Sequence, residues 1–246
     1  LKLSLSWGAL GNNAVDNYEY QSVYNKDNYV LGNSVVPGLA QIQLANALVS
    51  WETTYVTNIG LDFSLFGSKL DGTIELFNKD THDILIDLPA PLLVGNASIP
   101  TQNAARVRNR GMEMNLKWNH RIGKVNYFVG GNFTFIDNEV TRFKGEERSI
   151  SGTNMIQEGY PINIQYVLAV DRILQTDEDM LFVEKMIKDA PVDPATGQRV
   201  NPFASYGTPK KGDFLYKDLN GDGVIDDNDK YVVGHGLAPR LTYGFS

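Results

Sequence analysis

The chain contains no cysteine, which excludes a disulfide framework, a cysteine-based metal site and a thiol nucleophile. It also lacks any apolar run of about 18 residues, the length that a transmembrane helix requires. Its formal net charge of -7 argues against a nucleic-acid-binding surface, because such surfaces carry clustered positive charge. What remains is an acidic chain of 246 residues, enough for one or two domains.

Catalytic motifs are missing as well. The three histidines are His82, His120 and His235, and none has a spaced serine, aspartate or glutamate set that forms a triad pattern. The chain has neither an HExxH motif nor a phosphate-binding loop. Glu146 and Glu147 lie in a polar stretch, where carboxylates are usually solvated. We therefore expect no enzymatic activity.

The chain is rich in alternating apolar and polar residues, most clearly from Trp51 to Thr81. In the first strand of this segment, odd positions such as Ile59, Leu61 and Phe63 become increasingly apolar, whereas the even positions are mostly polar or small. Since strand side chains alternate between two faces, one face is apolar and the other polar. The segment forms two strands joined by a short turn, and each strand exceeds the roughly 9–11 residues of a tilted transmembrane strand. The pattern indicates a barrel wall between lipid and water.

The same alternation predicts six antiparallel strands, near residues 1–9, 51–66, 69–80, 106–121, 124–137 and 237–246. Their connections alternate between long and short, as in outer-membrane barrels with short periplasmic turns and long extracellular loops. A soluble β-sandwich also alternates, but it gives no reason for this asymmetry. The residues expected to face lipid are Ile59, Leu61, Phe63, Met112, Met114, Leu116, Val129 and Phe133.

The expected strands also bear on domain organisation. The chain begins and stops inside strands and has no signal peptide at its start. Six strands with two open edges would leave unpaired backbone in lipid. We therefore expect residues 1–246 to be an internal part of a longer barrel, with residues 137–236 as one long extracellular loop.

Six segments have sequences that are characteristic of one family. They are residues 5–12 (LSWGALGN), 51–62 (WETTYVTNIGLD), 103–113 (NAARVRNRGME), 159–162 (GYPI), 218–229 (DLNGDGVIDDND) and 239–245 (PRLTYGF). In this order they resemble SusC/RagA-type TonB-dependent transporters of the Bacteroidota, and the resemblance covers essentially the whole chain. It implies the C-terminal part of a 22-strand barrel in the Gram-negative outer membrane.

The resemblance also implies a function for the intact protein. That protein would import oligomeric nutrients, either glycans or peptides, driven through TonB by an N-terminal region absent from this chain. A SusD-like surface lipoprotein would cover the extracellular loops, and outer-membrane lipid would surround the barrel. The alternative is a calcium-stabilised extracellular β-rich binding or adhesion module, which would not depend on detergent.

Residues 218–229 fit the twelve-residue calcium-loop pattern. Gly223 occupies the sixth position, where the loop turns sharply, and Asp229 stands at the twelfth, where EF-hands have glutamate. No helix clearly flanks the loop on both sides, so a structural Ca²⁺ is expected rather than a sensor site. The alternative is a solvated acidic turn. The expected ligands are Asp218, Asn220, Asp222, the Val224 carbonyl, Asp226 and Asp229.

Any specificity for a substrate would depend on the long connections between the strands. Aromatic rings among amide side chains suit sugars, and the candidate substrate-binding residues are Tyr18, Tyr20, Tyr24 and Trp51; alternatively, the tyrosines pack the loop against the barrel rim. The connection from Lys79 to Arg106 contains an apolar segment, 85–94, that must be buried against something. In the third connection, Thr176 can cap a helix over residues 177–188, with Met180, Val183 and Ile187 on one stripe.

Overall fold

The computed structural model describes residues 1–15, 17–86, 95, 97–144, 148–234 and 236–246. The chain divides into two compact units. The first comprises Leu1–Ile150, Met155–Asn163 and His235–Ser246, and the second comprises Ser151–Asn154 and Ile164–Gly234. The long strands belong to the first unit and the helix to the second.

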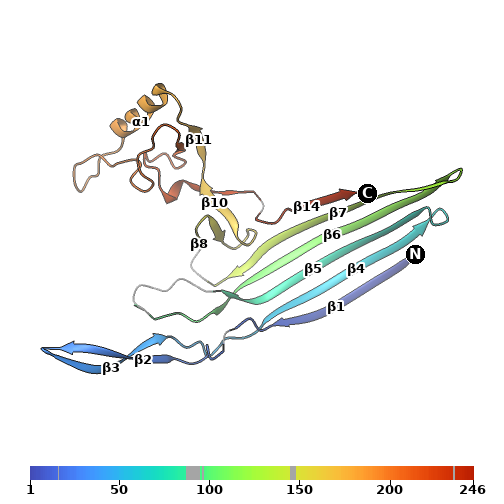
Figure 1. Ribbon diagram of the computed structural model, residues 1–246, viewed down its shortest axis with the longest axis horizontal. Coiled ribbons are helices and arrows are strands. Elements are labelled where there is room, and N and C mark those ends of the chain that lie inside the picture. The colour runs from blue at the N-terminus through green and yellow to red at the C-terminus, as the bar shows by residue number, and fades with distance from the viewer. Residues whose placement is uncertain (16, 87–94, 96, 145–147, 235) are drawn as a thin grey trace. The chain divides into compact units, whose positions relative to one another are not determined.

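A six-stranded antiparallel sheet forms the first unit (Figure 1). Its strands, in spatial order, are β1 (Lys2–Asn12), β4 (Glu52–Leu65), β5 (Leu70–Ile86), β6 (Gln102–Ile122), β7 (Val125–Phe143) and β14 (Leu241–Phe245). This order confirms the predicted wall of six strands, in which each strand pairs with the next predicted strand of the chain.

Four strands extend further at their loop ends than the alternation predicted, and the strand predicted at 1–9 continues to Asn12. The strand predicted at 69–80 continues to Ile86, the one at 106–121 begins at Gln102, and the one at 124–137 continues to Phe143. Pairing in these extensions contains register shifts, after Thr81 in β5 and between Arg106 and Val107 in β6. Such bulges interrupt the alternation in the sequence without ending the pairing. The predicted last strand, 237–246, is shorter, at 241–245.

The strand extensions enclose a small apolar core. Ala105, Val107, Val140 and Phe143 are buried together, and Ile84, Ile86, Ile156 and Ile162 pack against them. The predicted loop from Lys79 to Arg106 is therefore shorter, and Leu85 and Ile86 belong to β5. The other apolar residues of that segment lie outside the described residues; they are Leu88, Pro89, Pro91, Leu92, Leu93 and Val94.

The first long connection contains a hairpin of β2 (Val23–Leu31) and β3 (Ser34–Gln43), which the alternation did not predict. The turn between them is Gly32-Asn33, and Gly32 has a φ of 63°, as two-residue hairpin turns require. The residues of β2 are all exposed, so the hairpin has no apolar face buried within the described residues.

The second unit packs around Leu174, Val183, Phe203, Leu215 and Ile225. Its elements are β10 (Ile164–Leu168), β11 (Val170–Ile173), α1 (Asp177–Asp189), β12 (Phe214–Tyr216), the 3-10 helix η2 (Asp227–Asp229) and β13 (Lys230–Val233); the short strands β8 (Ser149–Ser151) and β9 (Asn154–Ile156) lie where the units adjoin in sequence. β10 pairs with β13, and β11 with β12.

Helix α1 is one residue longer than predicted and follows most of the predicted stripe. Val183 is fully buried, and Met180 packs against the same core, which includes Leu215 of β12. Ile187 was expected on this stripe but is exposed. In the described part of the chain, no helix is long and apolar enough to cross a membrane.

Candidate functional site

The sheet has one apolar face, and strand register assembles it. One row across the sheet consists of Leu3, Leu61, Ile74, Met114, Phe133 and Tyr243. Cross-strand partners share a face, so the register confirms that the eight residues predicted to face lipid lie on the same side. A hollow at Gly131 on this face is lined by Leu116, Phe133 and Phe245.

Aromatic pairs mark both ends of the apolar face. Trp7 stacks on Tyr55 with ring centroids 6.3 Å apart, and Phe66 lies 6.2 Å from Trp118 at the other end. Phe66 lies eleven positions after Tyr55, which corresponds to about 36 Å of extended chain. At a tilt of about 45°, this spans roughly the 25 Å height of the apolar band of an outer-membrane barrel.

The opposite face is polar and hydrogen-bonded across the strands. Asn138 donates to Asn109 at 2.7 Å, and Thr73 donates to Asp62 at 3.1 Å. Glu75 lies directly opposite Glu113 in the register of β5 and β6. This face can present amides, hydroxyls and carboxylates to a water-filled interior.

Beyond its last apolar row, at the end near the long connections, the apolar face becomes charged. Arg106 and Arg108 both approach Asp80, at 3.2 and 3.6 Å. Arg110 and Arg240 both contact Asp137, at 3.1 and 2.9 Å. This cluster was not predicted, although Arg106, Arg108 and Arg110 alternate along the sequence.

The structure brings two of the four candidate substrate residues together. The rings of Tyr18 and Tyr20 are 6.5 Å apart, and both are exposed. Between them, the buried Glu19 accepts hydrogen bonds from the backbone N–H and the hydroxyl of Thr101, at 3.1 and 3.2 Å. Glu19 therefore anchors the segment while its neighbours point to solvent, and sequence reasoning missed this role.

Tyr24 and Trp51 occupy separate places. Tyr24 lies on β2 beside a register irregularity, and the Trp51 ring lies close to Gly11. Trp51 is positioned by its neighbours, because the Asn103 amide binds both backbone groups of Ser50 at 2.8 Å. Asn103 also donates to the Asp83 carbonyl at 2.7 Å, so this one amide joins three segments.

The acidic loop 218–229 is closed by its own hydrogen bonds. Asp218 accepts from the N–H groups of Gly221 and Gly223, at 2.6 and 2.8 Å. Asp222 accepts from Val224 N–H at 2.8 Å, and Asp226 from Asn228 N–H at 2.7 Å. In this arrangement the carboxylates accept hydrogen bonds from backbone N–H groups of the loop itself.

Asp229 is the centre of the loop. Its side chain is fully buried and accepts from the N–H groups of Leu219, Asn220 and Asp226, at 2.8, 3.2 and 2.9 Å. Among the described residues, no group of three or more histidine, cysteine, aspartate or glutamate side chains is arranged to hold a metal ion. The calcium site stays a prediction.

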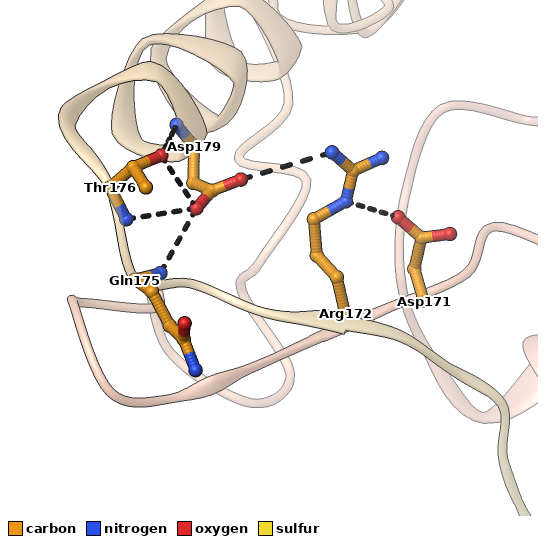
Figure 2. Close-up of polar contacts among 5 residues, drawn as sticks. All are labelled: Asp171, Arg172, Gln175, Thr176 and Asp179. Carbon is orange, nitrogen blue, oxygen red and sulfur yellow. Dashed lines mark hydrogen bonds and ion pairs between the residues drawn. The ribbon is translucent and has the colours of Figure 1, made fainter.

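The start of α1 is fixed by a reciprocal cap (Figure 2). Thr176 accepts from Asp179 N–H at 3.2 Å, and the Asp179 carboxylate accepts from the N–H groups of Thr176 and Gln175 at 2.9 and 3.0 Å. These backbone donors lower the pKa of Asp179 to about 2, with a smaller contribution from Arg172. This arrangement confirms the prediction that Thr176 caps the N-terminus of the helix.

A second polar contact in this unit joins Tyr206 to Asp227. The Tyr206 hydroxyl donates to Asp227, which also contacts Lys230 at 3.1 Å. Burial is the main cause that raises the pKa of Tyr206, and the hydrogen bond to Asp227 raises it further. Tyr206 also lines a recess with Phe203, Phe214 and Tyr216.

The chain is similar to proteins with known names. It is 30% identical to the TonB-dependent receptor P39 of Formosa agariphila over 263 residues, covering all of the chain and 25% of that protein. It is 27% identical to the TonB-dependent receptor SusC of Bacteroides thetaiotaomicron, covering 99% of the chain and 24% of SusC. The chain thus spans about a quarter of the length of these relatives.

Among solved structures, the RagAB peptide transporter matches with a TM-score of 0.66 and 23% identity, over 99% of this chain and 24% of that one. This likeness supports the fold. The family model for the β-barrel of TonB-dependent receptor-like proteins matches residues 3–170. Family members are outer-membrane transport receptors rather than enzymes. On this match, together with the two-faced sheet, the chain belongs to the TonB-dependent receptor family and forms part of its β-barrel.

Proposed function

We propose that this chain is part of the wall of a SusC-like transporter that imports oligomeric nutrients across the outer membrane. The observation that carries the proposal is the register of the sheet, which gathers apolar side chains on one face and polar ones on the other. Lipid would contact the first face and cargo the second. Loss of uptake on deletion of the protein, restored by its re-expression, is the direct test.

The orientation follows from the connections. The two short turns, between β4 and β5 and between β6 and β7, lie at one end of the strands, and the long connections lie at the other. Because outer-membrane barrels have short periplasmic turns, we assign the long connections to the cell exterior. A protease added to intact cells should then cut residues 144–240 before it cuts the short turns.

The cargo would be a glycan or a peptide. The resemblance to SusC/RagA-type transporters allows both classes, and one similar structure is a peptide importer. On this chain, the amides of Asn109 and Asn138 and the exposed rings of Tyr18 and Tyr20 are the candidate contacts. Mass spectrometry of ligand retained by the native protein would decide between the two classes.

The partners would be a SusD-like surface lipoprotein over the long connections and TonB on the periplasmic side. The described strand β5 includes Leu85 and Ile86, so the deletion that tests the lipoprotein interface is best confined to residues 87–94. It should weaken lipoprotein capture in a pull-down while the barrel stays heat-stable in detergent. Unchanged capture would remove that connection from the interface.

Two results would contradict the transport proposal itself. One is undiminished growth on every tested glycan and peptide after the protein is deleted. The other is an intact protein that stays monodisperse without detergent, which would favour an extracellular binding or adhesion module. The second result is not expected, because the central rows of the sheet place apolar side chains on one face.

A further inference from the structure

We propose that the charged end of the apolar face binds the phosphate groups of outer-leaflet glycolipid. The proposed site, here called the arginine cluster, consists of Arg106, Arg108, Arg110, Arg142 and Arg240. The inference rests on the membrane orientation given under the proposed function. It adds a specific lipid contact that barrel insertion alone does not require.

Strand register places the cluster at the border of the apolar face. The last apolar row contains Leu76 and Met112, and the next row on the same face pairs Asn78 with Arg110. One row further, Arg108 pairs with Asp80. In a barrel with its apolar face in lipid, side chains just beyond the apolar rows lie at the height of the lipid headgroups.

The remaining members lie on the same side. Arg106 donates to Asp80 at 3.2 Å, and Arg142 lies opposite Arg106 in the register of β6 and β7. Arg240 reaches this face from the start of β14, where its guanidinium lies 5.2 Å from the Phe135 ring centroid. Two strands, β6 and β7, and the approach to a third, β14, thus contribute to one cluster.

The cluster is positive in a chain that is otherwise acidic. It holds five of the nine arginines, although the formal net charge is -7. The carboxylates in the same rows are Asp80, Asp137 and Glu139. Within these rows of the described strands, five guanidinium groups face three carboxylates, an excess of two positive charges. Moreover, Arg106 and Arg142 are like charges directly opposite each other, an arrangement that destabilises a sheet unless an anion lies between them.

The two aspartates, Asp80 and Asp137, hold the guanidinium groups in place without occupying all of their hydrogen-bond donors. Each aspartate lies between two arginines, with N–O distances from 2.9 to 3.6 Å. A guanidinium has five donors in a rigid fork that matches phosphate oxygens. Arg110 gives two of them to Asp137 and is 60% exposed. Beside it, a recess of about 260 Å³ is lined by two arginines, Arg110 and Arg240, and by two carboxylates, Asp137 and Glu139.

A phosphorylated lipid fits this arrangement better than a soluble anion. Its phosphates would meet the guanidinium groups while its acyl chains covered the adjacent rows at Met112 and Phe135, which lie in register on the same face. A soluble anion would gain only the polar half of this contact. Because the cluster lies at the end of the strands assigned to the cell exterior, where the outer leaflet consists of glycolipid, the ligand class is a glycolipid with phosphate on its headgroup.

The test uses the complete protein purified in detergent and lipid A, a bisphosphorylated glucosamine lipid, as the probe. Native mass spectrometry counts retained lipid for wild type, for Arg110→Gln/Arg142→Gln, and for the control Arg121→Gln/Lys124→Gln. The control makes the same charge change at the β6–β7 turn, the opposite end of the same strands. Loss of two charge-assisted contacts should weaken retention about tenfold, and the control should retain lipid as wild type does.

Several outcomes would overturn the inference. These are equal retention by the arginine variant and wild type, equal loss in the control, equal retention of dephosphorylated lipid A, or equal competition by phosphatidylglycerol. The variant Arg110→Lys/Arg142→Lys keeps the charge without the fork, and intermediate retention is expected. Nutrient uptake is measured on the same variants, so a failure of lipid binding with normal uptake refutes this inference and leaves the transport proposal standing.

Discussion

At the scale of single residues, Asp229 determines whether the acidic loop closes. It is fully buried and accepts three backbone N–H groups, so Asp229→Ala would leave buried donors unpaired, at a cost of roughly 1–3 kcal/mol. Hydrogen exchange in the intact protein should show lost protection at Leu219, Asn220 and Asp226. The control Asp189→Ala, at the exposed end of α1, should leave their protection unchanged.

Calcium binding to the same loop is a separate prediction. We expect Ca²⁺ with oxygen ligands at about 2.3–2.6 Å, drawn from Asp218, Asn220, Asp222, the Val224 carbonyl, Asp226 and Asp229. Asp222→Ala should then make the loop sensitive to protease in the presence of calcium, and chelator should have no further effect on that variant. A native protein without calcium by elemental analysis, and indifferent to chelator, would identify the loop as an acidic turn held by Asp229.

The cap of α1 has a defined pH dependence. The pKa of Asp179 is lowered from 3.8 to about 2 because the folded carboxylate accepts backbone N–H groups. A lowered pKa stabilises the folded state above the unfolded value, and this contribution is lost as pH falls through the folded value. Carbon NMR of the carboxyl group should therefore show titration near pH 2. In Asp179→Asn, amide protection at Gln175 and Thr176 should lose its dependence on pH in this range.

At the scale of elements, Gly111 of β6 leaves no room for a side chain beside β7. A Cβ there would lie 2.1 Å from the Phe135 carbonyl oxygen and 2.7 Å from the Phe77 ring. Gly111→Ala forces the strands apart, at a cost of about 1–3 kcal/mol as in other overpacked sites. Gel electrophoresis of heated and unheated samples should show a smaller fraction of folded barrel for this variant. Gly8→Ala is the matched control, since a Cβ at Gly8 meets nothing within 4 Å.

The strand cores were predictable from the sequence because alternation is a local property. Strand ends were not, since the bulges near Thr81 and Arg106 change the phase of the pattern while long-range pairing continues. The β2–β3 hairpin escaped prediction because β2 contains Asn25, Asp27 and Asn28, which have low strand propensity. The Gly32-Asn33 turn was its one local signal.

The candidate site was predictable only in part, for the same reason. The cap at Thr176 and the acidic loop are short motifs, and both were visible in the sequence. The pairing of Asp80 with Arg106 and Arg108 depends on the register between strands, which no local pattern specifies. The anchoring of Glu19 by Thr101 joins segments 82 residues apart.

At the scale of the whole molecule, the two faces of the sheet should respond differently to charge. Met114 lies in the middle of the apolar face and Glu113 on the polar face. Met114→Arg should cost roughly 2–4 kcal/mol when the barrel is in lipid, whereas Glu113→Arg should cost little. Urea titration of the complete protein in liposomes measures both. Equal costs for the two variants would argue against lipid contact at Met114.

The pairing of β10 with β13 has a consequence for how such proteins diversify. Gln165 lies opposite Val233, so the main segment of the second unit, Ile164–Gly234, begins and ends at neighbouring backbone positions. A segment whose ends are neighbours can be lengthened, replaced or removed without pulling on the strands that precede and follow it. We therefore expect residues 164–234 to tolerate changes in length and sequence better than the strands of the six-stranded sheet do.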